Sequence, residues 1–234
     1  MSSKNAPYEK SIVKEKSRGI IKQYILDTIP RNNQLRALTL CNNTLDMEES
    51  LLNQYRSGSF CECFEWLPTR FKKLEETLHE KGYNHTSCYT GRGKNSIFQR
   101  SSFYNKLIGP RFYTYYGDIY QYSFRKDKLN VAIMDTCSKC TKDLIDKIGP
   151  FAREFGQTCR DTSVFTLTIT KQHGFNEKQL YNLYGYKDFK GSGIAFLIAD
   201  QLQNVTHIRR LKYACKDISP SASQMFTYLF TIKK

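Results

Sequence analysis

Near its C-terminus the chain carries Thr206-His-Ile-Arg-Arg-Leu-Lys-Tyr-Ala-Cys215 and Met225-Phe-Thr-Tyr-Leu-Phe-Thr-Ile232, two runs rich in β-branched and aromatic residues. Both runs predict β-strands. The polar link between them, around Asp217-Ile-Ser-Pro-Ser221, is too short to hold a crossover helix. Because parallel neighbours need a connection of a dozen or more residues, these two strands must form an antiparallel hairpin.

The residues before this hairpin alternate between strand-like and helix-like stretches. Apolar or β-branched runs predict strands over 36–41, 59–65, 112–116, 130–135 and 164–170. Helical spacing and capping residues predict helices over 8–29, 45–57, 68–81, 141–155 and 194–202, with a break or kink at Gly149-Pro150. The sequence therefore predicts an α/β fold: a seven-stranded, mostly parallel sheet with helices on both faces and a C-terminal antiparallel hairpin.

Length and composition indicate one globular domain with an extension. The 234 residues are 40% apolar, and we expect residues 1–32 to form a basic N-terminal helical extension to a domain over 33–234. No apolar run is long enough to span a bilayer, and the first residues lack the apolar core of a secretory signal. The eight cysteines are scattered, which favours reduced thiols. We expect a soluble intracellular protein, cytoplasmic or nuclear, without a membrane partner.

The net charge of +14 is not spread evenly: a basic insertion at about 83–111 contains no acidic residue and interleaves cations with aromatic rings. Its cations are Arg92, Lys94, Arg100, Lys106 and Arg111. Cations neutralise phosphates and aromatic faces stack on bases, so this segment predicts a nucleic-acid partner, DNA or RNA. The alternative is a solvated basic loop whose aromatic residues pack into the core.

Acidic residues follow three of the predicted strands. Glu65 ends the run over 59–65, Gly117-Asp118 follows the run over 112–116, and Asp135 ends the run over 130–135. In open α/β sheets the loops at the carboxyl ends of the strands diverge and leave a crevice for ligands. We therefore expect these acids to meet in one small-molecule site. Individually, each could instead cap a helix or remain solvated.

This order of elements resembles the class I S-adenosylmethionine-dependent methyltransferases over residues 33–234. The resemblance implies that Glu65 holds the ribose of S-adenosylmethionine, and that Gly117, Asp118 and Ile119 line its adenine pocket, for which Trp66 and Ile119 are the candidate apolar slot. It also implies that Asp135 lies beside the transferred methyl group, where we name it as the candidate catalytic residue. A carboxylate suits both the ribose diol and the adenine amino group as a hydrogen-bond acceptor.

The family usually has a glycine-rich turn after its first strand, and this chain has Cys41, Asn42, Asn43 and Thr44 there instead. The resemblance assigns these residues to the cofactor site. Asparagine tolerates the left-handed conformation better than other non-glycine residues, so we expect Asn42 or Asn43 to replace the missing glycine.

The sequence thus predicts an S-adenosylmethionine-dependent methyltransferase acting on nucleic acid. The alternative is a catalytically inactive relative that binds nucleic acid or an acidic partner. The Asp135-Thr-Cys-Ser138 sequence lacks the motifs of DNA amino-methylating and cytosine-C5 enzymes. Cys137-Ser-Lys-Cys140 has no second ligand pair near it, so no metal site is predicted.

Overall fold

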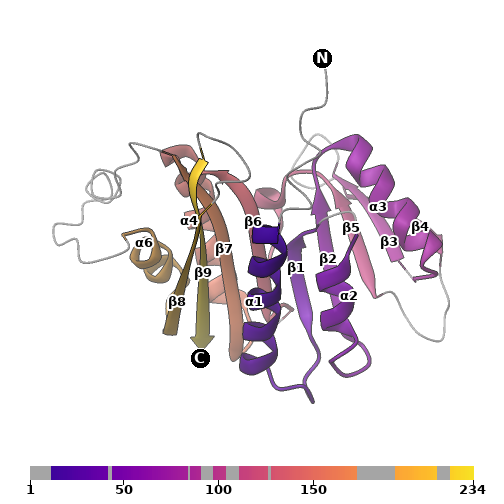
Figure 1. Cartoon of the computed structure of the whole chain (residues 1–234). Coiled ribbons are helices and arrows are strands. Elements are labelled where there is room, and N and C mark those ends of the chain that lie inside the picture. Colours follow the sequence, from indigo (N-terminus) through magenta and orange to yellow (C-terminus); the bar gives the residue numbers. More distant parts are fainter. Residues whose placement is uncertain are drawn as a thin grey trace.

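The computed structural model describes residues 12–41, 44–83, 85–90, 97–103, 111–125, 128–172, 193–214 and 222–234. In these ranges the chain forms a nine-stranded sheet with helices packed on both faces (Figure 1). The strands are β1 (Arg36–Leu40), β2 (Phe60–Glu65), β3 (His85–Thr90), β4 (Ile97–Phe103), β5 (Phe112–Tyr116), β6 (Val131–Lys139), β7 (Thr162–Gln172), β8 (Val205–Ala214) and β9 (Ala222–Lys233). The helices are α1 (Ile12–Thr28), α2 (Asp46–Leu52), α3 (Pro68–Glu80), the short 3-10 helix η2 (Ile119–Gln121), α4 (Lys142–Thr158) and α6 (Gly193–Leu202).

Seven of the strands form the predicted mostly parallel sheet, in the order β5-β2-β1-β6-β7-β9-β8. β1 pairs in parallel with β2 and β6, β2 with β5, and β6 with β7. β9 is antiparallel to both β7 and β8, so the C-terminal hairpin is confirmed. The predicted sheet and its direction of pairing are therefore correct.

The structure adds two strands that the sequence analysis did not predict. The basic segment contributes β3, which pairs in parallel with β5, and β4, which pairs antiparallel with β3 at the edge of the sheet. This segment mixes polar and aromatic residues without a long apolar run. An edge strand such as β4 needs no such run, because it is not buried between two neighbouring strands, and β3 lies directly beside it. The segment therefore extends the sheet instead of forming only a loop.

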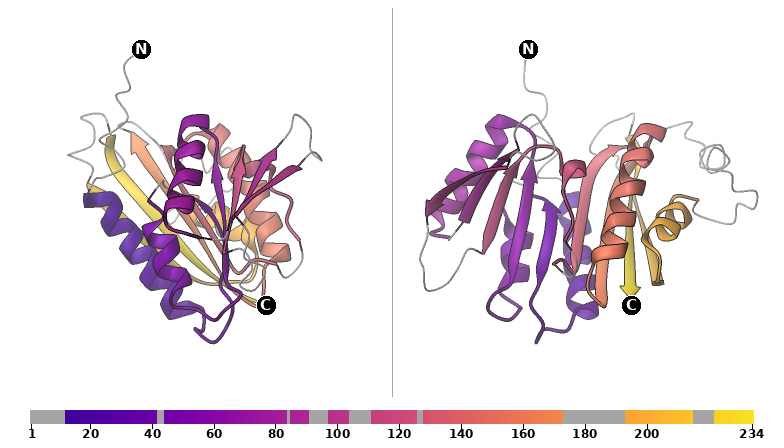
Figure 2. Two further views of the ribbon diagram at one scale, coloured as in Figure 1. Left: turned by 90° about the vertical axis from the view of Figure 1, so that its right-hand side faces the viewer. Right: turned by 180° about the vertical axis from the view of Figure 1, so that it is seen from behind.

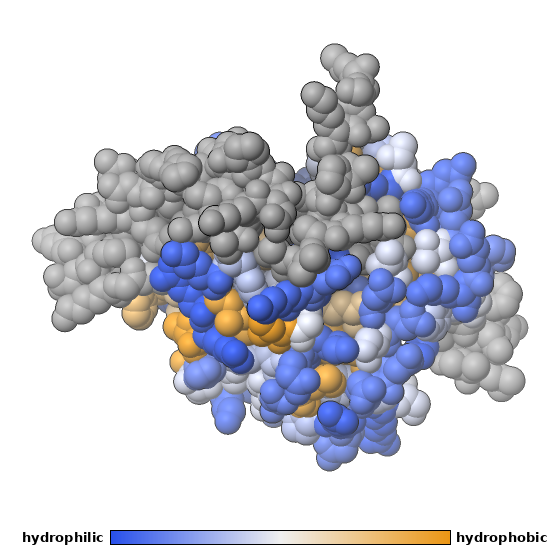
Figure 3. All heavy atoms as spheres, viewed as in Figure 1, coloured by the Kyte–Doolittle hydropathy of each residue, from blue (hydrophilic) through white to orange (hydrophobic). Residues whose placement is uncertain are grey.

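The helices form a layer on each face of the sheet. α1, α2 and α3 lie on one face, and α4 and α6 lie on the other (Figures 1 and 2). Hydrophilic side chains gather over α2 and α3 on the surface that Figure 3 shows, as expected for helices whose outer faces meet water.

α1, which we expected as an extension, is packed against the sheet. Its buried residues Ile21, Ile25 and Ile29 belong to the core between the first helical layer and the strands. The Tyr24 hydroxyl lies 2.7 Å from the Thr231 hydroxyl of β9, and the two form a buried hydrogen bond. The helix therefore contributes directly to the core of the domain.

Of the break or kink predicted at Gly149-Pro150, the break is wrong, because one helix runs from Lys142 to Thr158 with Pro150 inside it. Pro150 lies on the exposed side, where water can satisfy the carbonyl that loses its helical partner. Phe151 and Phe155 are buried on the opposite side. Their packing outweighs the lost hydrogen bond.

α4 and α6 approach each other closely at Gly156. A Cβ atom added to Gly156 would lie 1.9 Å from the carbonyl oxygen of Leu202, which is backbone and cannot rotate away. Gly156 is therefore required for the packing of these two helices.

We expect Gly156→Ala to destabilise the protein by about 1–3 kcal/mol, because the added methyl group forces α4 and α6 apart. Gly19→Ala is the matched control: it also changes a helical glycine, but nothing lies within 4 Å of the point where its Cβ atom would stand. This control should stabilise α1 by about 0.5–1 kcal/mol. Urea unfolding of both variants measures the difference, and equal effects of the two substitutions would contradict the close contact.

Candidate functional site

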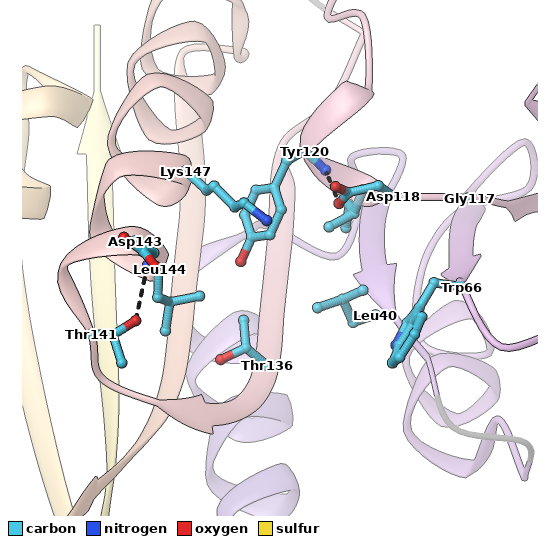
Figure 4. A pocket seen from close by; sticks show the side chains of 11 residues that line it. Leu40, Trp66, Gly117, Asp118, Tyr120, Thr136, Thr141, Asp143, Leu144 and Lys147 are labelled. Carbon is cyan, nitrogen blue, oxygen red and sulfur yellow. Dashed lines mark hydrogen bonds between the residues drawn. The ribbon is translucent and has the colours of Figure 1, made fainter. Parts of the chain in front are cut away.

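A cavity of about 480 Å³ opens at the carboxyl ends of β1, β2, β5 and β6 (Figure 4). Residues from the ends of these strands and from the start of α4 line it. They are Leu40, Trp66, Gly117, Asp118, Ile119, Tyr120, Thr136, Thr141, Asp143, Leu144 and Lys147. This is the edge at which the sequence predicted a small-molecule site, and the volume is within the usual range for such sites.

Asp118 lies in this cavity together with Trp66, Gly117 and Ile119, the residues predicted to line the adenine pocket. One of its carboxylate oxygens accepts a hydrogen bond from the backbone N–H of Tyr120 at 3.1 Å, which caps η2. Trp66, with 66% of its surface exposed, lies on the same side of the cavity as Asp118, facing the α4 residues, while Ile119 is buried (Figure 4). The structure therefore combines a carboxylate acceptor with apolar walls.

Glu65 is next to Trp66 but is not among the residues that line the cavity. Its side chain is buried, and the Oε1 atom accepts a hydrogen bond from the backbone N–H of Leu67 at 2.9 Å. This contact fixes the turn between β2 and α3. Glu65 thus lies at the edge of the cavity and shapes the loop that carries Trp66.

Asp135 points to the other face of the sheet. Its carboxylate lies 3.5 Å from the guanidinium of Arg18 and 3.7 Å from Nζ of Lys14, both on α1. Side chains alternate along a strand, and the following residue, Thr136, lines the cavity. The structure therefore does not bring all three strand-end acids together, because β6 continues past Asp135 and its alternation turns that side chain toward α1.

A second acid, Glu48 of α2, lies buried near Asp135 and accepts a hydrogen bond from the Thr39 hydroxyl at 3.1 Å. Burial raises the pKa of Glu48 and outweighs the opposing charge of Arg18, while the Asp135 carboxylate raises it further. The folded state therefore binds this proton more tightly than the unfolded chain does. Stability is lost as the pH rises above the ordinary pKa of a glutamate.

We expect Glu48→Gln to raise the melting temperature more at pH 8 than at pH 5, because the amide keeps an acceptor for Thr39 and removes the cost of a buried charge. A gain of about 1 kcal/mol corresponds to roughly 2–4 °C. Calorimetric melts at both pH values measure it.

Glu49→Gln is the control, for which we expect the opposite change in stability. Hydrogen bonds from Lys81 and Tyr83 lower the pKa of Glu49, so its contribution is present above the ordinary glutamate pKa and is lost at acid pH. This substitution should destabilise the protein at pH 8. The same sign for both variants would contradict the assignment for Glu48.

The loop after β1 is only partly described. Cys41 is buried at its start, Thr44 is exposed, and Asn42 and Asn43 lie outside the described residues, so the left-handed asparagine remains a prediction. Leu45 itself adopts the left-handed conformation, with φ of 57° and ψ of 15°. A non-glycine residue accepts this at a cost of about 1–2 kcal/mol. Its fully buried side chain explains how the turn is held.

Sequence reasoning missed the wall of the cavity that α4 and η2 provide. Thr141 caps α4 by accepting a hydrogen bond from the N–H of Leu144, and Asp143 and Lys147 follow on the same helix. A predicted strand followed by a threonine that can cap a helix could have indicated Thr141 as a residue at the carboxyl edge of the sheet. Tyr120 gave no such signal.

Tyr120 has a buried hydroxyl that makes no hydrogen bond within the described ranges. Burial raises the pKa of this hydroxyl, and the neighbouring Asp118 charge adds to the effect. Nζ of Lys147 lies 5.9 Å from the centre of its ring. The cavity therefore offers a polar atom to a ligand at the end that faces α4 (Figure 4).

Most of the predicted nucleic-acid contacts cannot be placed. Arg92, Lys94 and Lys106 lie outside the described residues, and only the backbone of Arg100 is described, in β4. Arg111 precedes β5 and donates a hydrogen bond to the Asn53 side chain at 3.2 Å. In the described ranges, no helix is long and apolar enough to cross a membrane, and no cluster of His, Cys, Asp and Glu could hold a metal ion.

The same architecture occurs in solved methyltransferases. A putative sarcosine dimethylglycine methyltransferase from Galdieria sulphuraria superposes with a TM-score of 0.59 at 12% identity, over 98% of this chain and 91% of that one. The chain has the class I methyltransferase fold. TYW2 of M. jannaschii, solved in complex with AdoMet, matches with a TM-score of 0.52 at 11% identity, over 96% of this chain and 78% of that one.

A further match of this fold is a SAM-dependent methyltransferase from Methanosarcina mazei, with a TM-score of 0.51 at 9% identity, over 90% of this chain and 97% of that one. No protein-family model matches the sequence, and no curated protein matches it either. The likeness is therefore one of three-dimensional structure at low identity, and it establishes the fold.

Proposed function

We propose that this protein is an S-adenosylmethionine-dependent methyltransferase. The observation that carries the proposal is the cavity at the carboxyl edge of a class I methyltransferase fold, lined by Asp118 and Trp66 on one side and by α4 on the other. Structures that share this fold include one in complex with AdoMet.

The described residues fit such a cofactor. The Asp118 carboxylate is an acceptor suited to an adenine amino group, and Trp66, Ile119 and Leu40 provide apolar surfaces beside it. When bound, the cofactor would supply an activated methyl group on a sulfonium. Glu65 is proposed to hold the ribose from the edge of the cavity, and the loop of Cys41 to Thr44 to approach the cofactor with its backbone.

Methyl transfer from a sulfonium is a displacement that depends mainly on alignment, so the protein's contribution is to hold the acceptor in line. We propose that Asp135 acts here as a positioning residue. Its ion pairs with Lys14 and Arg18 hold α1 across the end of β6, next to Thr136 in the cavity wall. The cavity wall and the N-terminal part of α1 are thereby kept in one arrangement.

We expect S-adenosylmethionine to change the fluorescence of Trp66, which is the single tryptophan of the chain and lines the cavity. Asp118→Asn should weaken binding at least about tenfold, because it replaces a charged acceptor while an amide oxygen can still cap η2. Titration by fluorescence and calorimetry measures both affinities.

The matched control is Asp27→Asn, which changes an exposed aspartate in the last turn of α1, on the face of the sheet opposite α4. It should bind as the wild type does. Binding that survives Glu65→Ala and Asp118→Ala together would remove the assigned pocket.

We further propose that the methyl acceptor is a nucleic acid. The charge of +14 and the interleaved cations and aromatic rings of residues 83–111 support this class. Transfer of a labelled methyl group to RNA or DNA should exceed transfer to protein extracts, and it should fall when Arg92 and Lys94 are both replaced by glutamine. Labelling of protein alone would contradict the proposed acceptor.

A second candidate function is nucleic-acid or acidic-partner binding by an inactive relative. The glycine-free first loop and the left-handed Leu45 favour it, since backbone access to a cofactor is usually provided by glycine there. Salt-dependent nucleic-acid binding together with no measurable S-adenosylmethionine affinity would select this candidate.

A further inference from the structure

Among the described residues, no helix covers β2 and β5 on the face of the sheet that carries α4 and α6. These helices lie over the part of the sheet that contains β6, β7, β8 and β9 (Figure 2, right). The connection from β5 to β6 contains only η2 and an irregular segment among its described residues. β2 and β5 are therefore covered on this face by loop residues, as far as the chain is described.

Aromatic and basic side chains gather there, at the amino ends of β1, β2 and β5. We call this set the Phe60 cluster, and it consists of Arg36, Phe60, Tyr113, Tyr122 and Lys128. The rings of Phe60 and Tyr113 meet edge to face, with their centres 5.5 Å apart. Nζ of Lys128 lies 6.0 Å from the Phe60 ring centre and 5.6 Å from that of Tyr122, and the Arg36 guanidinium lies 5.9 Å from Phe60. All five side chains are partly exposed.

Further cations surround this cluster. Arg160 is close enough to Arg36 for its charge to lower the pKa of that guanidinium, in addition to the larger effect of burial. Arg125 is exposed, and its charge reaches Tyr122. The Glu62 carboxylate is buried beneath the cluster and forms an ion pair with Lys128. Glu62 is therefore engaged below the surface by Lys128. Above it Arg36 and Arg160 repel each other, and Arg125 adds a third positive charge beside Tyr122.

The aromatic rings and the surrounding arginines together suit a ligand that is an anion and also presents flat π surfaces. Phosphates neutralise the charges of Arg36, Arg125 and Arg160 and relieve the repulsion between Arg36 and Arg160, and bases stack on exposed aromatic rings. A duplex hides its base faces, whereas a single strand exposes them. An acidic peptide would neutralise the arginines but gives the rings nothing to stack on.

We propose that the Phe60 cluster is a binding surface for single-stranded nucleic acid. Arg36, Arg125 and Arg160 contact phosphates, and the Tyr113 ring stacks on a base. The surface is separate from the cavity, because Arg36 and Phe60 begin β1 and β2 whereas Leu40 and Trp66 lie at the far ends of those strands. It shares the nucleic-acid class with the function proposed above but does not require methyl transfer.

The test is fluorescence anisotropy of a labelled, mixed-sequence single-stranded RNA of about 15 nucleotides, titrated with the full chain at several salt concentrations and without S-adenosylmethionine. Arg125→Gln with Arg160→Gln should reduce the slope of log affinity against log salt by about 1.4, since each phosphate contact to a single strand contributes about 0.7. Tyr113→Leu should weaken binding about five- to a hundredfold by removing a stacking surface.

Two controls separate these effects from general charge and from misfolding. Lys72→Gln with Lys73→Gln removes two cations from α3, on the opposite face, and should leave the slope within experimental error. Tyr113→Phe keeps the ring and should bind as the wild type does. The melting temperature of each variant is measured alongside, and Asp118-dependent S-adenosylmethionine binding should be unchanged in all of them.

Several results would overturn the proposal. These are an equal loss of slope in the α3 control, unchanged affinity in Tyr113→Leu, tighter binding of the matched duplex, and equal competition by polyglutamate. Loss of RNA binding in the cluster variants with intact S-adenosylmethionine binding supports it. Failure of S-adenosylmethionine binding in the wild type would reject the proposed enzyme without affecting this result.

Discussion

β1 has a parallel partner on each side, β2 on one edge and β6 on the other, and the location of the cavity follows from this arrangement. From β1 the chain builds outward through β2 to β5, and then returns across β1 to build β6 and β7. The loops that leave β1 and β6 must therefore diverge in opposite directions. The cavity opens between them, with Leu40 and Thr136 at its base and Asp118 and Thr141 on its two sides.

The buried strands and the residues in the turns directly after them could be predicted from the sequence. Runs such as Val131-Ala-Ile-Met134 are buried on both sides of the sheet, so their apolar character alone reveals them. Gly117-Asp118 was found because a polar pair directly follows such a run. The direction of Asp135 was not found, since a shift of one residue in the end of the strand reverses the face to which a side chain points.

Other features depended on contacts between distant residues. Tyr120 became a cavity residue only because α4 packs against η2, and β3 and β4 formed because the edge of β5 was open to pairing. A buried hydroxyl contact of 2.9 Å joins Ser17 of α1 to Thr227 of β9, and Thr227 in turn contacts Thr168 of β7 at 3.1 Å. Threonines in a strand suggest only β propensity, so nothing local indicated that a helix would be hydrogen-bonded to them.

The position of β9 has a consequence for synthesis on the ribosome. β8 is paired only with β9 among the described strands, and β9 lies between β8 and β7 although it follows both in the chain. While translation proceeds, β7 therefore presents an open edge and β8 has no place in the sheet. Until residues 222–233 have emerged, the nascent chain exposes an unpaired strand edge to which strands of other chains can pair.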